Sequence, residues 1–190
     1  MKKIVSDKEL ILKMKESIDL LCNTVKTTLG PSGNNIIIDN SLLEPYITND
    51  GVTIAKNIES EDEVVNTILE LAKEATINTD DNVGDGTTTT LVLLQSIFNE
   101  GLKCIESGIS PIILKKELDK ILTEIINKVK EKSRKPSNKE LKNIALISSN
   151  DEEIGNTIYE VFSKIKDINF INLVEGINNY VNYTKGYVID

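Results

Sequence analysis

Apolar side chains recur every three or four residues over much of the chain, a spacing that places them on one face of an α-helix. In residues 8–29 they form one continuous stripe, and Gly30 with Pro31 ends the pattern. A second helical pattern runs from about residue 62 to residue 79, with acidic residues favourably placed near its amino end. The first stripe comprises Leu10, Met14, Ile18, Leu21, Val25 and Leu29.

Two further helices are predicted beyond a run of threonines. Residues 91–98 are apolar nearly all round, so we expect this third helix to be buried at the centre of its domain. The fourth helix begins with Ser110 as N-cap and Pro111 at the first helical position. Its apolar side, which we expect to meet other helices, comprises Leu114, Leu118, Ile121, Leu122, Ile125, Ile126 and Val129.

Short β-strands are predicted in two places. Residues 35–39 and 46–47 are rich in β-branched and aromatic side chains and flank a turn through residues 40–45, which predicts a hairpin. The polar composition of residues 133–138 indicates a segment that connects to a second part of the chain. That part is predicted to hold two shorter helices, 138–147 and 151–165, and then strands at 168–174 and 180–189. The fold class expected is mainly α, with a hairpin and a small α/β segment.

Composition excludes several classes of function. The chain has 190 residues, 39% of them hydrophobic, so it can bury a core of one or two domains. A net charge of -8 argues against a nucleic acid or an anionic membrane as the main partner. Histidine is absent from the sequence, which excludes Ser-His-Asp triads, Cys-His dyads and most zinc sites. Any chemistry must therefore use carboxylates, hydroxyls and backbone amides.

The two cysteines and the apolar runs indicate the compartment. Cys22 and Cys104 lie far apart on helical patterns without a CxxC spacing, so we interpret them as reduced packing residues. No apolar run approaches the roughly 18 residues of a membrane span, and the first residues are not followed by a signal-peptide core. We expect a cytoplasmic protein.

The motif Gly84-Asp85-Gly86, followed by the threonines 87–90, carries the clearest chemistry. Glycines allow the backbone to bend tightly against a ligand, and threonines at a helix start offer hydroxyls beside unpaired amides that attract phosphate. Asp85 would repel phosphate unless a hard cation, most plausibly Mg²⁺, lay between them. The motif indicates a metal-bridged nucleotide, although taken alone it also suits a capped helix without a ligand.

Two other glycine-bearing turns precede this motif, at residues 28–33 and 48–53, each next to a helical pattern. Three such turns in this order resemble the start of the chaperonin family, the ATP-driven double-ring protein-folding machines. The resemblance extends from about residue 5 to about residue 187. Residues 46–54 and 80–83 are also similar to the archaeal and eukaryotic cytosolic branch, but the later half favours the bacterial and organellar branch, group I. Its further motifs are Glu100-Gly101-Leu102-Lys103, Ser107-Gly108-Ile109-Ser110-Pro111, Leu114-Lys115, Ile147-Ser148-Ser149-Asn150-Asp151-Glu152 and Ile154-Gly155.

The resemblance implies a domain organisation. Residues 1–132 would form part of the helical equatorial domain, which binds ATP and makes most ring contacts. Residues 133–190 would form part of the intermediate domain and lead to an apical domain that this sequence does not contain. The hairpin and residues 1–5 would join neighbouring subunits within a ring, whereas an ordinary surface hairpin is the alternative.

The resemblance also implies roles for ten residues. Asp85 would ligate Mg²⁺, and Asp50 would position or activate the hydrolytic water, although Asp50 also suits a turn or an N-cap. Asn49 and Ser32 stand where the family commonly has basic residues, and the loss of a cation there should weaken nucleotide binding. The nucleotide-binding set is Thr28, Leu29, Gly30, Pro31, Asp85, Gly86, Thr87, Thr88 and Thr89.

Three functions follow from these observations. The first is a portion of an ATP-dependent chaperonin subunit, whose partners would be other subunits in a ring, with unfolded clients and a co-chaperonin only if an apical domain exists elsewhere. The second is a non-enzymatic module that docks on other subunits through its uncovered helix faces. The third is a free-standing nucleotide-binding protein. Because a second catalytic carboxylate of the family lies on a later segment, we expect the isolated chain to show no appreciable ATPase activity.

Overall fold

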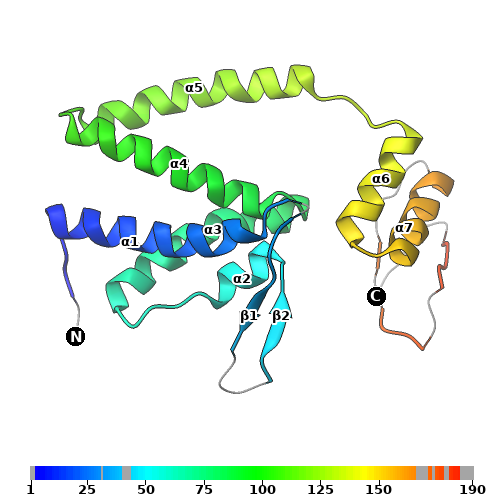
Figure 1. Ribbon diagram of the computed structural model, residues 1–190. Coiled ribbons are helices and arrows are strands. Elements are labelled where there is room, and N and C mark those ends of the chain that lie inside the picture. The colour runs from blue at the N-terminus through cyan, green and yellow to red at the C-terminus, as the bar shows by residue number, and fades with distance from the viewer. Residues whose placement is uncertain are drawn as a thin grey trace. The chain divides into compact units, whose positions relative to one another are not determined.

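A computed structural model describes residues 3–30, 32–39, 44–165, 171–172, 174–177 and 180–184. The described residues are mainly helical and include a two-stranded hairpin, which confirms the predicted fold class (Figure 1). The chain divides into two compact units, residues 1–124 and 125–190, so the division falls inside helix α5 (Pro111–Lys132). The strands expected at 168–174 and 180–189 lie largely outside the described residues, and the part of them that is described contains no strand.

Three long helices form the core of the first unit. They are α1 (Asp7–Val25), α3 (Glu63–Val83) and α4 (Thr87–Glu106), which pack against one another (Figure 1). Each contributes a large apolar side chain that is fully buried. Burial of one such side chain stabilises the fold by about 1.5 to 3 kcal/mol relative to leaving it exposed to water. These side chains are Leu21, Leu69 and Leu91. The apolar faces of α1 and α3 therefore pack together in this core.

The ends of α3 are set by local signals. Asp62 is its N-cap and accepts hydrogen bonds from the amides of Val64 and Val65, and its carboxylate also pairs with Lys13 of α1 at 2.5 Å. The helix continues four residues past the predicted end and stops at Gly84, whose φ of 70° is left-handed. Glycine adopts this conformation without the steric penalty of a side chain, so it terminates the helix.

A hairpin and a short helix complete the first unit. Strand β1 (Ile36–Ile38) pairs antiparallel with β2 (Tyr46–Thr48), and Ile37 lies opposite Ile47. The predicted turn between them lies mostly outside the described residues. Helix α2 (Gly51–Asn57) follows directly and buries Ile54 and Ala55 against the core. The second predicted glycine turn therefore opens a helix of only two turns.

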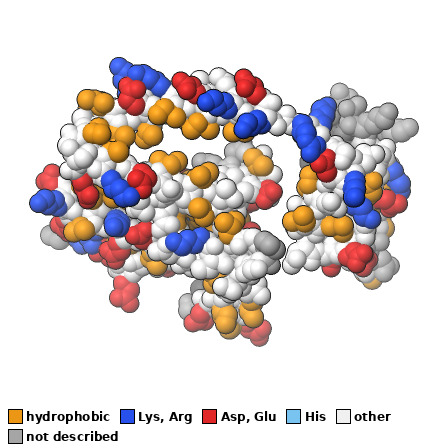
Figure 2. Space-filling view, turned by 45° about the horizontal axis from the view of Figure 1, so that its top comes forward, with side chains coloured by type: hydrophobic (Ala, Val, Ile, Leu, Met, Phe, Trp, Pro, Cys, Tyr) orange, Lys and Arg blue, Asp and Glu red, His pale blue; other side chains and the backbone are white. Residues whose placement is uncertain are grey.

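The prediction that the third helix is buried on all sides is wrong. Leu91 is the one buried residue among those of α4, whereas Leu93 and Ile97 are more than half exposed. Helix α5 covers little of α4, and none of its own residues is buried. Figure 2 shows a row of hydrophobic side chains along α5, at the top of the view. The apolar patterns of both helices therefore exceed what α1 and α3 cover.

The second unit contains a pair of helices, α6 (Asn138–Ser149) and α7 (Glu152–Lys164), within a residue or two of the predicted bounds. Ser137 and Glu140 form a capping box at the start of α6. The two helices approach closely at Gly155, where an added β-carbon would lie 2.8 Å from Cα of Leu146. Glycine is therefore required at this crossing.

Candidate functional site

The turn after α1 is compact and depends on two glycines. A 3₁₀ turn, η1 (Lys26–Thr28), extends α1, and Gly30 follows with a left-handed φ of 81°. The amide of Gly33 donates to the carbonyl of Gly30 at 2.9 Å. A β-carbon at position 33 would lie 2.1 Å from the carbonyl oxygen of Thr28, so no larger residue fits there without moving the backbone.

A second glycine turn joins α3 to α4. Gly84 and Gly86 both have left-handed backbones, with φ of 70° and 79°. Between them, Oδ1 of Asp85 accepts a hydrogen bond from the amide of Gly86 at 2.7 Å. Helix α4 then starts at Thr87 with Gly86 as its N-cap and with no side-chain cap. The first amides of α4 are therefore free of a capping group, which favours an anionic ligand at this end.

These two turns face one pocket of about 170 Å³. The pocket is smaller than the about 300 to 1,000 Å³ typical of small-molecule sites, so its size suits a phosphate group rather than a whole nucleotide. Its lining contains eight of the ten predicted site residues. They are Thr28, Leu29 and Gly30 from the first turn, and Asp85, Gly86, Thr87, Thr88 and Thr89 from the second. Pro31 lies outside the described residues.

The tenth predicted residue, Asp50, is not among those that line the pocket. Asp50 is the N-cap of α2, and its Oδ2 accepts a hydrogen bond from the amide of Thr53 at 2.9 Å. The next residue, Gly51, contacts the pocket wall, because a β-carbon there would lie 2.4 Å from Oγ1 of Thr88. Asp50 thus has a clear structural role and stands beside the pocket wall.

The donor set of the pocket suits a phosphate bridged by a cation. Threonine hydroxyls and uncapped helix amides can donate to phosphate oxygens, and among the described residues of the lining Asp85 is the only charged one. Within the described part of the chain, no three acidic or cysteine side chains gather into a metal site. A divalent ion at Asp85 would therefore take its other ligands from phosphate oxygens and water, as Mg²⁺ commonly does.

Two contacts that hold the second turn in place were not predicted from the sequence. The hydroxyl of Thr76, a fully buried residue of α3, donates to the carbonyl of Thr87 at 3.1 Å. One helical turn further along, the hydroxyls of Thr79 and Thr90 lie 3.1 Å apart. In the sequence, Thr76 falls among the apolar positions of an ordinary amphipathic pattern, so no local signal marked it.

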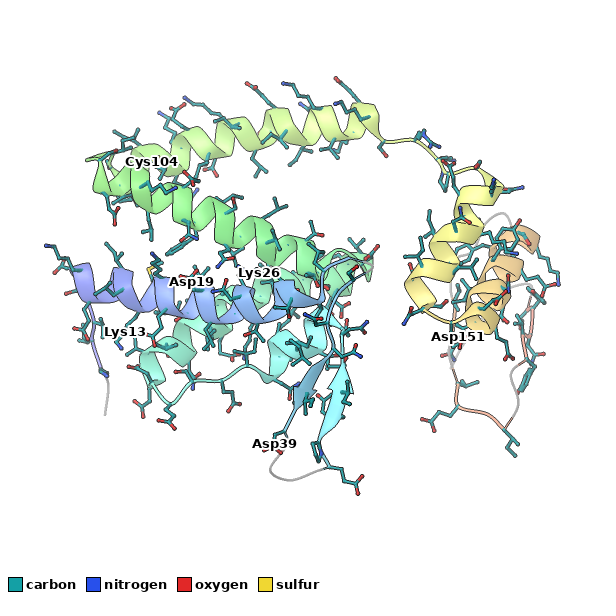
Figure 3. All side chains as sticks on the ribbon, in the orientation of Figure 1. Lys13, Asp19, Lys26, Asp39, Cys104 and Asp151 are labelled. Carbon is teal, nitrogen blue, oxygen red and sulfur yellow. The ribbon has the colours of Figure 1, made fainter. Side chains whose placement is uncertain are left out.

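A polar cluster ties α4 to α1 on another side. The side-chain amide of Gln95 donates to Asp19 at 2.7 Å and to Asn23 at 3.0 Å. Lys26, from the 3₁₀ turn, donates to Gln95 at 3.4 Å. Figure 3 labels Asp19 and Lys26 along this face of α1 and η1. These bonds fix the position of α4 along α1, and with it the spacing of the two turns.

No helix among the described residues is long and apolar enough to cross a bilayer.

Comparison with known proteins gives a consistent match. The model of the TCP-1/cpn60 chaperonin family matches residues 21–190. Among solved structures, the chain is similar to the chaperonin gp146 from the bacteriophage EL 2 (Pseudomonas aeruginosa), crystallised in presence of ATP-BeFx. The identity is 26% and the TM-score 0.77, over 92% of this chain and 31% of that one. The fold is also that of a group III chaperonin in the open state, with 22% identity and a TM-score of 0.70, over 84% of this chain and 32% of that one. The chain therefore spans about a third of the length of these proteins.

Proposed function

Because the chain belongs to the TCP-1/cpn60 chaperonin family, we propose that it serves as an amino-terminal portion of an ATP-dependent protein-folding chaperonin subunit, with Mg²⁺-ATP bound at residues 84–89. The observation that carries this proposal is the pocket shared by two turns that are more than 50 residues apart in sequence, with Thr28 and Gly30 on one side and Asp85 to Thr89 on the other. A helix cap without a ligand would not need the first turn beside it.

In this proposal each residue type at the pocket has a task. The uncapped amides of α4 and the hydroxyls of Thr87, Thr88 and Thr89 hold the phosphate oxygens. Asp85 holds Mg²⁺, which offsets the charge repulsion between the carboxylate and the phosphates. The glycines let the backbone approach the ligand closely. Because no other charged residue lines the pocket in the described part of the chain, binding should depend strongly on the divalent cation at Asp85.

Several finer assignments belong to the same proposal. Residues 1–132 would be part of the equatorial domain and residues 133–190 part of the intermediate domain. The partners would be other chaperonin subunits in a ring, in the cytoplasm. The motifs in residues 100–111 support the bacterial and organellar branch, group I, whereas the solved structures reported above are a phage and a group III chaperonin. A role for Asp50 in ATP hydrolysis is also part of the proposal.

Calorimetric titration of the 190-residue chain with Mg²⁺-ATP tests the nucleotide assignment. Wild type should bind, Asp85→Ala should bind at least tenfold more weakly, and chelation of Mg²⁺ should have a similar effect. Asp81→Ala is the matched control, because Asp81 is an exposed acid four residues before Asp85 and does not line the pocket. Equal binding heats for wild type and Asp85→Ala would refute the proposal.

One observation favours the second candidate, a docking module without ATP hydrolysis. Helix α5 has no buried residue, and eight of its apolar side chains between Ile112 and Val129 are 41% to 81% exposed, more than a surface helix normally leaves uncovered. Native mass spectrometry with an intact chaperonin ring separates the two. A complex that forms equally well with Asp85→Ala and without nucleotide would support docking, whereas a free monomer would count against it.

A further inference from the structure

We propose that Thr76 is a positioning residue for the pocket: its buried hydroxyl holds the first turn of α4, and with it the phosphate-facing groups of residues 87–89, in the binding geometry. The inference rests on the proposed nucleotide function. It adds a residue of α3 that does not line the pocket.

The hydrogen bond of Thr76 differs from those of other threonines in the same helix. A threonine within a helix commonly donates to the carbonyl four residues earlier. Thr67 and Thr79 do so, at 2.9 Å and 2.8 Å. Thr76 instead donates across the helix interface to the carbonyl of Thr87 at 3.1 Å. Thr76 is completely buried. In a buried site a hydrogen bond is stronger, and its loss destabilises the structure more than at the surface.

The acceptor of this bond stands at the junction between the α3–α4 turn and α4. Thr87 is the first residue of α4 and follows Gly86, whose left-handed backbone leaves the helix without a side-chain cap. Gly84 lies just before, also left-handed. A turn with two glycines has many accessible conformations, so an anchor on Thr87 removes freedom that ligand binding would otherwise have to remove.

Helix α2 is a second element that restricts the position of Thr87. A β-carbon at Gly51 of α2 would lie 3.2 Å from the hydroxyl of Thr87 and 2.4 Å from that of Thr88. Thr87 is thus held by a hydrogen bond from α3 and by close packing from α2. Such support from neighbouring elements is what keeps a binding group in a productive orientation.

The experiment compares three variants of the full 190-residue chain. Thr76→Val keeps the shape and removes the hydroxyl, and Thr76→Ser keeps the hydroxyl. Thr67→Val is the control, because the exposed hydroxyl of Thr67 donates to the carbonyl of Glu63 within α3 and Thr67 does not line the pocket. Calorimetry with Mg²⁺-ATP should give a three- to tenfold weaker affinity, roughly the effect of one hydrogen bond, for Thr76→Val and near wild-type affinity for the other two. Should Thr76→Val fail to fold, Thr76→Ala is measured in its place.

A readout without nucleotide separates this inference from the proposed function. The amide of Thr90 donates to the carbonyl of Gly86 at 2.9 Å and so reports the opening of the first turn of α4. Its hydrogen exchange, followed by NMR, should be about three- to tenfold faster in Thr76→Val and unchanged in Thr76→Ser.

The outcomes are distinct. If wild type binds no Mg²⁺-ATP, the proposed function fails, and exchange at Thr90 alone decides whether Thr76 anchors the turn. If wild type binds but Thr76→Val binds equally well, the function stands and the positioning role is overturned. Thr76→Ser as weak as Thr76→Val, or an equal loss in Thr67→Val, would also overturn it.

Discussion

Gly51 and Thr88 are in such close contact that a β-carbon on Gly51 would lie 2.4 Å from the Thr88 hydroxyl oxygen. The two residues come from different helices: Gly51 begins α2 directly after Asp50, and Thr88 belongs to the first turn of α4 and lines the pocket. The contact joins two of the three glycine motifs of the sequence at one point.

Substitution Gly51→Ala should therefore weaken Mg²⁺-ATP binding. The new methyl group forces the Thr88 hydroxyl to rotate away, and a lost hydrogen bond corresponds to a three- to roughly tenfold loss of affinity. It would also stand 3.3 Å from Val25, so we expect a stability loss of about 1 kcal/mol. Calorimetry and thermal denaturation measure the two effects separately.

The control for this variant is Gly101→Ala, in the interior of α4. A β-carbon there meets only Leu114, at an ordinary 3.7 Å. Alanine should stabilise the helix by about 0.5 to 1 kcal/mol and leave nucleotide affinity unchanged. Wild-type affinity in Gly51→Ala would show that Thr88 does not contribute a fixed hydroxyl to the ligand.

Local signals in the sequence were sufficient to predict most of the helices. Gly30 and Pro111 mark a helix end and a helix start through backbone geometry that each residue carries by itself, so they could be identified without the structure, whereas the end of α3 at Gly84 was placed four residues too early. The eight pocket residues could be assembled in advance only through the family resemblance, because nothing in local sequence brings residues 28–30 beside 85–89.

The remaining features depend on packing between helices. Thr76 could not be singled out, because its role is set by the carbonyl that α4 presents to it. The burial of α4 was predicted wrongly for a related reason. The sequence of α4 indicates how apolar the helix is, but which neighbouring elements cover it depends on the tertiary arrangement. Leu93 and Ile97 are exposed although their local pattern is that of a core helix.

In the second unit, Gly155→Ala should loosen the pairing of α6 with α7. The added methyl group would lie 2.8 Å from Cα of Leu146 and 2.9 Å from the Ser149 hydroxyl. Because a backbone atom cannot rotate away, the helices must separate, at a cost of about 1 to 3 kcal/mol. Thermal denaturation monitored by circular dichroism measures this loss. An unchanged melting temperature would show that the two helices are not held at this distance.

The ion pair between Lys13 and Asp62 predicts a pH-dependent contribution to stability. The hydrogen bond from Lys13, supported by the amides of Val64 and Val65, lowers the pKa of Asp62 from 3.8 to about 2. A carboxyl with a lowered pKa in the folded state stabilises the fold above its unfolded pKa, and this contribution is lost as the pH falls from about 4 to about 2. Asp62→Asn keeps an N-cap side chain but removes the charge.

The Asn variant should therefore be less stable than wild type at pH 7, and the difference should shrink as the pH falls to about 2. Denaturant unfolding at several pH values measures this. Asp81→Asn is the control, since Asp81 is exposed on the same helix, and at pH 7 its free energy of unfolding should match that of wild type. A difference that stays constant between pH 7 and pH 2 would contradict the assignment.

Substitution can separate the two roles of Asp50, which are the N-cap of α2 and the proposed part in ATP hydrolysis. The carboxylate caps α2 through the Thr53 amide at 2.9 Å, so Asp50→Ala should lower the free energy of unfolding by about 0.5 to 2 kcal/mol. Asp50→Asn keeps the capping oxygen and should fold as wild type does.

Because Asp50 does not line the pocket, Asp50→Asn should also bind Mg²⁺-ATP with wild-type affinity, in contrast to Asp85→Ala. We expect wild type itself to show no appreciable turnover of ATP, since Asp50 is engaged as the N-cap of α2 and does not line the pocket. If the isolated chain does hydrolyse ATP and Asp50→Asn abolishes that activity without loss of stability or affinity, the expectation of an inactive chain is wrong and Asp50 acts on the hydrolytic water rather than only on α2.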